Sequence, residues 1–101
     1  MSLMNFETAL HYAERGIGNL MRIKKNIVGV YELMGSWRKA LLYYEYLLSN
    51  HTEEEISFGY IYERAASICL ELGEKEEFRK NMKLAVEWYK KEENYEKIDT
   101  L

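Results

Sequence analysis

The sequence predicts an all-α protein built from antiparallel helical hairpins, and three observations support this prediction. The chain of 101 residues contains no proline, whereas average usage would give about five. Proline breaks helix interiors, so its absence suits a chain that is helical nearly throughout. Apolar residues recur at helical spacing along most of the chain. Gly35 and Gly73, 38 residues apart, each follow such a segment and precede another.

The clearest hairpin lies around Gly35. Ile27 and Met34 lie on one apolar face of the preceding helix, and Trp37 opens a similar face after the glycine. Gly35 should end the first helix, because glycine adopts the left-handed terminating conformation without strain. Ser36 is then expected to cap the next helix.

Five helices are expected in all. They cover approximately residues 3–15, 19–34, 37–48, 52–72 and 74–91, and residues 92–101 either extend the last helix or fray. The fourth helix has the clearest start, since Thr52 and Glu55 match a capping box and the acidic run between them suits the helix dipole. Gly29, inside the second helix, costs about 1 kcal/mol relative to alanine, which is tolerable if another backbone must approach there.

Inward-facing positions are predicted for the fourth and fifth helices from their apolar periodicity. They are Ile61, Ala65, Ile68, Cys69 and Leu72 in the fourth, and Phe78, Met82, Ala85 and Trp88 or Tyr89 in the fifth.

The charge is unevenly distributed along the chain. The net formal charge is −3; residues 1–51 carry six Lys/Arg and four Glu, whereas residues 52–101 carry eight basic and thirteen acidic residues. Neither half is basic enough to indicate a nucleic-acid-binding domain. The gradient either orients a partner, promotes head-to-tail self-association, or is an ordinary solvated surface.

The single cysteine excludes an internal disulfide framework and suits a reducing, cytoplasmic location. Cys69 lies on the apolar stripe and is expected to be a small buried hydrophobe. No apolar run approaches the ~18 residues of a membrane span, and the N-terminus lacks the pattern of a signal peptide.

The segment Tyr31-Glu-Leu-Met-Gly35 aligns with Cys69-Leu-Glu-Leu-Gly73. This self-similarity resembles the tetratricopeptide repeat, whose period is about 34 residues, with extra length at residues 50–57. The resemblance places Ile27, Val28, Tyr31, Gly35, Trp37, Ala40 and Tyr44 at the family's pattern positions. It implies a short right-handed stack in one domain: a half repeat at 3–16, repeats at 19–50 and 53–91, and a C-terminal extension at 92–101.

Catalytic and metal sites are not predicted. His11 and His51 lie on different elements, and Cys69 lies among apolar residues, so no nucleophile has a base and an orienting group nearby in sequence. No short metal-ligand spacing is present, and Glu53-Glu54-Glu55 is better interpreted as helix capping. Gly16-Ile-Gly18 lacks the pattern of a phosphate loop and is interpreted as a helix break. We therefore expect no cofactor.

The resemblance implies a concave groove lined by the first helix of each hairpin. Its positions are Arg22, Lys25, Asn26, Gly29 and Glu32 in the first copy, and Tyr60, Glu63, Arg64, Ser67 and Glu71 in the second. The first copy begins with a cationic, amide-bearing group suited to a carboxylate or acidic peptide, unless this is simply a solvated face. The family's carboxylate clamp requires a Lys with an Asn four residues later. This pattern is not matched, because Gly29 stands four residues after Lys25.

Nine tyrosines are a second possible sign of binding. Tyr43, Tyr44 and Tyr46 are too close in sequence to share one helical face, so at least one should be exposed or at an interface. The alternative is that tyrosines pack between helices with their hydroxyls at the edge.

Together these patterns predict a non-catalytic protein-interaction scaffold. It would bind a peptide or partner helix on the concave face, or self-associate as a homodimer through surfaces bearing Tyr and Trp. One alternative is a regulatory or sensor subunit that controls a DNA-binding or signalling partner without contacting DNA itself. The other is an enzyme with an unrecognised site.

Overall fold

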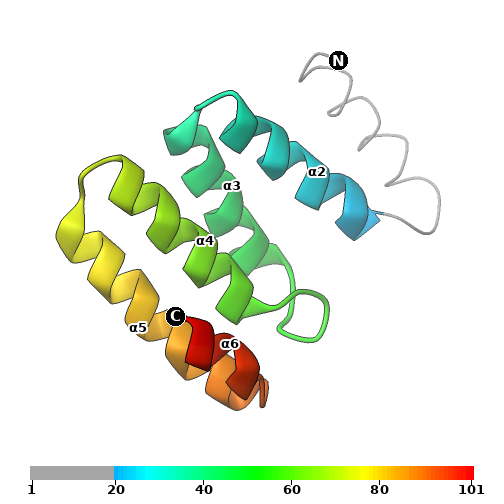
Figure 1. The fold of residues 1–101 in the computed structure, drawn as a ribbon. Coiled ribbons are helices and arrows are strands. Elements are labelled where there is room, and N and C mark those ends of the chain that lie inside the picture. The colour runs from blue at the N-terminus through cyan, green and yellow to red at the C-terminus, as the bar shows by residue number, and fades with distance from the viewer. Residues whose placement is uncertain (1–19) are drawn as a thin grey trace. The chain divides into compact units, whose positions relative to one another are not determined.

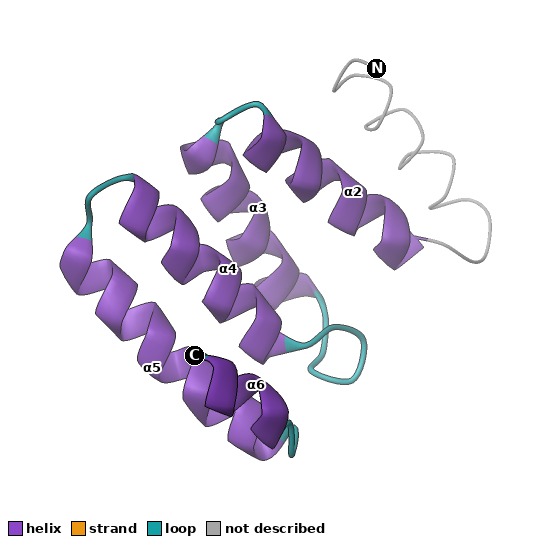
Figure 2. Ribbon diagram, in the orientation of Figure 1, coloured by secondary structure: helices purple, strands orange, loops and turns teal. Residues whose placement is uncertain are grey.

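The computed structural model describes residues 20–101, and this part of the chain is 79% helix without any strand (Figures 1 and 2). The all-α prediction is confirmed for these residues. The elements are α2 (Leu20–Leu33), α3 (Trp37–Asn50), α4 (Phe58–Glu71), α5 (Lys75–Lys91) and α6 (Tyr95–Thr100). The helix expected at residues 3–15, with the break at Gly16-Ile-Gly18, lies outside the described residues.

The described residues divide into two compact units, with the boundary between Tyr43 and Tyr44 in α3. In the first unit, Ile27 and Val28 of α2 and Ala40 of α3 are buried. The second unit has the larger described core, which consists of Tyr44, Leu47, Ile56, Ile61, Ala65, Ala66, Ile68, Cys69, Ala85 and Tyr89. Of the predicted inward residues of the fourth helix, Ile61, Ala65, Ile68 and Cys69 are buried, whereas Leu72 is half-buried and follows the end of α4. In α5, Tyr89 rather than Trp88 is the buried aromatic residue.

The two glycines end their helices as predicted. Gly35 and Gly73 have φ angles of 69° and 75°. After Gly35 the Ser36 amide donates to the Tyr31 carbonyl over 2.9 Å, and after Gly73 the Glu74 amide donates to the Cys69 carbonyl over 2.9 Å. These bonds satisfy carbonyls that a helix end would otherwise leave unpaired. The same turn therefore closes both hairpins.

The C-terminal residues neither extend α5 nor fray from it. The Asn94 amide donates to the Tyr89 carbonyl over 2.8 Å, and Glu93 has a φ of 57°. Glu93 thus occupies the left-handed position that Gly35 and Gly73 hold in the other turns. A separate helix, α6, follows this third turn.

The predicted start of the fourth helix is wrong. Residues 52–56 form a single turn in which the amides of Glu55 and Ile56 both donate to the Thr52 carbonyl. The helix itself begins at Phe58, and its cap is Ser57, whose hydroxyl accepts from the Tyr60 amide over 3.1 Å. Thr52 and Glu55 do not form the predicted capping box. The Thr52 hydroxyl donates to the Glu55 carboxylate instead of accepting from the Glu55 amide.

Helices α4 and α5 pack closely as an antiparallel pair. A Cβ placed on Gly59, in the first turn of α4, would lie 2.5 Å from Cδ1 of Tyr89, in the last turn of α5. Beside this contact, the rings of Phe58 and Trp88 meet edge to face with centroids 4.9 Å apart. The absence of a side chain at Gly59 is what allows the Tyr89 ring to lie against the α4 backbone.

Gly29, inside α2, has no close neighbour of the kind that would make its cost in a helix tolerable. Among the described residues, no side chain or backbone of another element lies within 4 Å of a Cβ built there. In the same unit, the rings of Tyr31 and Tyr43 pack at 6.3 Å and join α2 to α3.

Candidate functional site

The first predicted set lies on an exposed face of α2. Arg22, Lys25 and Asn26 are all exposed, and Gly29 and Glu32 are half-buried further along the helix. Within the part of the chain that the structure describes, the side chains of Arg22, Lys25 and Asn26 form no hydrogen bond and no ion pair. Because residues three and four apart lie side by side on a helix, these polar groups form one continuous surface.

The second predicted set is mostly engaged within the protein. On α4, Tyr60 and Glu71 are exposed, whereas Glu63, Arg64 and Ser67 are half-buried. The Glu63 carboxylate accepts a 3.0 Å hydrogen bond from the Tyr89 hydroxyl. The Ser67 hydroxyl donates to the Glu63 carbonyl over 3.3 Å. Sequence reasoning could not find the Tyr89–Glu63 bond, since the partners are 26 residues apart.

Burial and the neighbouring carboxylates change the acidity of Tyr89. The ring is 1% exposed. Removal of the hydroxyl from water is the main cause that raises the pKa of Tyr89 far above its ordinary value, and the hydrogen bond to Glu63 raises it further. Because the phenol stays neutral, it is a permanent hydrogen-bond donor to Glu63. This arrangement ties α5 to α4 and leaves Glu63 poorly placed for an outside ligand.

A second carboxylate closes the N-terminal end of α4. Glu92, which follows α5, accepts from the Ser57 hydroxyl over 2.7 Å and from the Gly59 amide over 3.2 Å. The negative charge therefore lies at the positive end of the helix dipole and satisfies a free amide. This end of α4 is occupied by the protein's own residues.

The loop between α3 and α4 borders an open pocket of about 480 Å³. Its lining residues are Leu48, His51, Thr52, Glu53, Glu54 and Phe58, all of which belong to the second unit. The lining combines an aromatic ring, an aliphatic side chain and two carboxylates. Sequence reasoning missed this pocket, because it assigned the acidic residues to the first turn of a helix. The available signal was the extra length between the two repeats.

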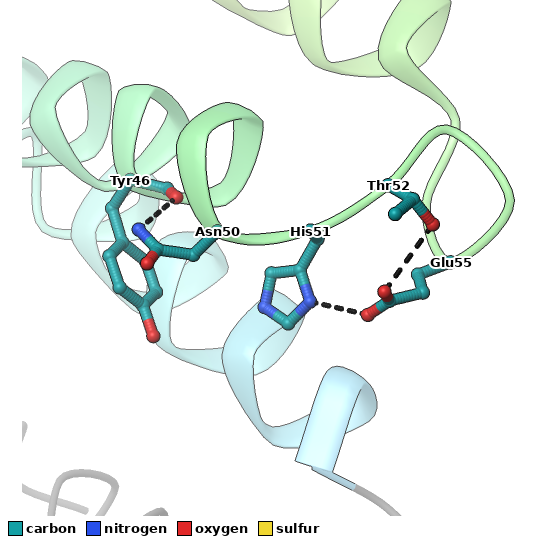
Figure 3. A network of polar contacts seen from close by, with 5 residues as sticks. All are labelled: Tyr46, Asn50, His51, Thr52 and Glu55. Atoms are coloured by element: carbon teal, nitrogen blue, oxygen red, sulfur yellow. Dashed lines mark hydrogen bonds and ion pairs between the residues drawn. The ribbon is translucent and has the colours of Figure 1, made fainter.

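A polar network sets the shape of this loop (Figure 3). Nδ1 of His51 lies 2.7 Å from Oε2 of Glu55, and the Thr52 hydroxyl donates to Oε1 of the same carboxylate over 3.3 Å. The hydrogen bond with His51 is the main reason that the pKa of Glu55 lies below its ordinary value. Asn50 closes the end of α3 by donating to the Tyr46 carbonyl over 2.9 Å. The third acidic residue of the loop is therefore fully engaged.

Several large apolar side chains are exposed. In the first unit these are Leu33, Met34 and Leu42, which are 89%, 62% and 65% exposed. In the second unit they are Tyr46, Tyr60, Leu70, Tyr95 and Leu101. The expectation that at least one of the three clustered tyrosines is exposed is confirmed, since Tyr44 is buried, Tyr43 is half-buried and Tyr46 is exposed.

Among residues 20–101, no group of three or more His, Cys, Asp or Glu side chains is arranged to hold a metal ion. Cys69 is buried, and its sulfur accepts from the Asn81 amide group at 3.7 Å. None of the described helices is both long and apolar enough to cross a membrane.

Comparison with known proteins gives no relative from which a role could be transferred. No protein-family model matches the sequence, and no curated protein or solved structure matches it either.

Proposed function

We propose that this protein is a non-catalytic, tetratricopeptide-like binding module of the cytoplasm, and that the exposed face of α2 binds an acidic segment of another polypeptide. One observation carries the proposal: Arg22, Lys25 and Asn26 are exposed together and have no partner among the described residues. Such side chains can bind carboxylates without first breaking a contact with any described residue. A guanidinium beside an ammonium and an amide supplies the donors that carboxylates accept.

The length of α2 gives this face a second, apolar part. Counting from Arg22, residues four, seven and eleven positions later lie on nearly the same side of the helix. These are Asn26, Gly29 and Leu33. Gly29 adds no bulk between the polar and the apolar end, and Leu33 is 89% exposed. A ligand with carboxylates at one end and an apolar residue at the other complements this face.

The cytoplasmic assignment rests on cysteine usage. The chain has one cysteine, Cys69, which is buried and forms no disulfide. Such usage is typical of proteins in a reducing compartment.

The proposal is tested with fluorescein-labelled peptides in an anisotropy titration at low salt. The probe is a Glu/Leu-containing peptide, and a Lys/Leu peptide of equal length is the control ligand. Only the acidic peptide should bind. Arg22→Glu with Lys25→Glu should weaken its binding by roughly tenfold or more, because reversed charges repel the peptide.

The matched control variant is Lys80→Glu with Lys83→Glu. These lysines have the same spacing, are exposed on α5, and have no described partner. The control variant should bind the acidic peptide as the wild type does. Equal loss in both variants would show a general charge effect and overturn the proposed site, as would absence of binding to the wild type.

A further inference from the structure

We propose that the acidic segment bound by α2 is the α3–α4 loop of a second copy of this chain, and that the pocket beside this loop receives the Arg22 side chain. This inference rests on the proposed function, since it names the partner of the same α2 face. It is carried by the pocket's chemistry and by two pairs of charged residues that have no partner among the described residues: Glu53 and Glu54 in the loop, and Arg22 and Lys25 on α2.

The pocket combines the features that bind a long cationic side chain. Phe58 supplies an aromatic ring, Leu48 an aliphatic surface, and Glu53 and Glu54 supply carboxylates around an open space of about 480 Å³. Arginine and lysine bury their methylene groups against apolar surface while the charged end meets carboxylates or an aromatic face. The carboxylates also exclude an acidic occupant, because like charges repel. The occupant that fits is therefore a basic side chain.

The three acidic residues of the loop are not equivalent. Glu55 is held by His51 and Thr52, as Figure 3 shows. By contrast, Glu53 and Glu54 are exposed and have no hydrogen bond or ion pair with any described residue. The network around Glu55 thus orders the loop, while the other two carboxylates stay available. An ordered loop loses less conformational freedom on binding.

The same chain carries the complementary group. Arg22 and Lys25 are exposed one helical turn apart, and they are likewise without a described partner. The charge distribution agrees, since basic residues exceed acidic ones in residues 1–51 and acidic exceed basic in residues 52–101. Because the two surfaces differ, their contact is heterologous, and a dimer would keep one free α2 face on one copy and one free loop on the other. Association should therefore continue beyond a dimer as the concentration rises.

The test uses two variants of the full chain in light scattering and sedimentation. One is Arg22→Glu with Lys25→Glu, and the other is Glu53→Lys with Glu54→Lys. At about 20 mM salt, where charges are weakly screened, the wild-type mass should at least about double between about 10 µM and about 1 mM protein. Each variant alone should stay monomeric. An equimolar mixture should again form mixed dimers or larger complexes, because the intact loop of the first variant can bind the intact α2 face of the second, and the two reversed surfaces are also opposite in charge.

Control variants separate this contact from general charge effects. Lys80→Glu with Lys83→Glu, and Glu76→Lys with Glu77→Lys, reverse the same numbers of exposed charges on α5. Both should associate as the wild type does, and circular dichroism confirms that every variant is folded.

Three outcomes would overturn the inference: a wild type that is monomeric at the highest concentration, association that survives in either site variant, or site variants that fail to form mixed complexes. If the protein stays monomeric yet binds the Glu/Leu peptide, the second copy is the wrong partner and the proposed function stands. If neither association nor peptide binding occurs, both proposals fail.

Discussion

The turns at Gly35 and Gly73 have the same hydrogen bonds, but the helices that they join are built differently. After Gly73, α4 and α5 are joined by the Tyr89–Glu63 bond and by the bonds from Ser57 and Gly59 to Glu92. On α2, ahead of Gly35, the polar side chains of Arg22, Lys25 and Asn26 are exposed and have no partner among the described residues.

This contrast shows how one local motif can serve two purposes. Carboxylates placed between packed helices contribute to stability, because each satisfies a donor that would otherwise lose its hydrogen bonds on burial. Polar groups that lack such partners contribute little to folding and are available for recognition. The place of a polar residue on its helix therefore does not decide its role. What decides it is whether another helix packs against that residue.

The two helix glycines provide the sharpest test of this difference. Gly59→Ala should destabilise the protein by about 2 kcal/mol, because the new Cβ would meet the buried Tyr89 ring and force it to move. Gly29→Ala should have the opposite sign and stabilise by up to about 1 kcal/mol, because alanine favours helix and meets no described neighbour. Urea unfolding followed by circular dichroism measures both values. Equal effects at the two positions would remove the distinction between the helices.

The three left-handed turn positions provide a second test. Gly35→Ala and Gly73→Ala should each cost about 1 kcal/mol, because a side chain disfavours positive φ. Glu93→Gly should instead stabilise the turn before α6 by about 1 kcal/mol, since it relieves that strain. The same unfolding experiment tests all three. Loss of stability in Glu93→Gly would mean that the glutamate side chain contributes more than its backbone conformation costs.

The hydrogen bond from Tyr89 of α5 to Glu63 of α4 can be removed by deleting a single oxygen atom. Tyr89→Phe keeps the ring against Gly59 and removes the donor to Glu63, so it should cost about 1 kcal/mol at neutral pH.

The pH dependence of the same bond has a definite sign. The pKa of Tyr89 is raised in the folded state, mainly by burial. The folded protein therefore favours the neutral phenol, and this stabilisation is complete below the ordinary tyrosine pKa of about 10 and is lost as the pH rises above it. Wild-type stability should consequently fall more steeply than that of Tyr89→Phe between neutral and strongly alkaline pH. Parallel curves would contradict the assignment.

The smallest change in stability is expected in the α3–α4 loop. This loop is the part of the chain that is longer than the tetratricopeptide pattern. The pKa of Glu55 is lowered, chiefly by its hydrogen bond with His51. Its contribution is therefore present above the ordinary glutamate pKa of about 4.3 and is lost as the pH falls through the folded value. Glu55→Gln should be slightly less stable than the wild type at pH 6 and equal to it in strong acid. A difference that persists at low pH would show that the loop does not depend on this charge.

Local patterns in the sequence were sufficient for the all-α class and for the α2–α3 and α4–α5 turns, but not for the start of α4 or for the separate helix α6. Apolar spacing located the buried stripe of α4, and Gly35 and Gly73 marked the helix ends, because both signals act within one or two helical turns. These features need no knowledge of distant residues.

Only the tertiary structure decided where α4 begins and which polar residues remain free. Thr52 and Glu55 satisfy a local capping rule, but Glu55 binds His51, and Ser57 becomes the cap with Glu92 beside it, 35 residues further along the chain. The resemblance assigns Glu63 and Arg22 to the same face of their respective helices. Of these two residues, only Glu63 accepts a hydrogen bond from Tyr89. The physical reason is that a polar group's hydrogen-bond partner depends on which elements pack against it, and packing depends on contacts between residues far apart in sequence.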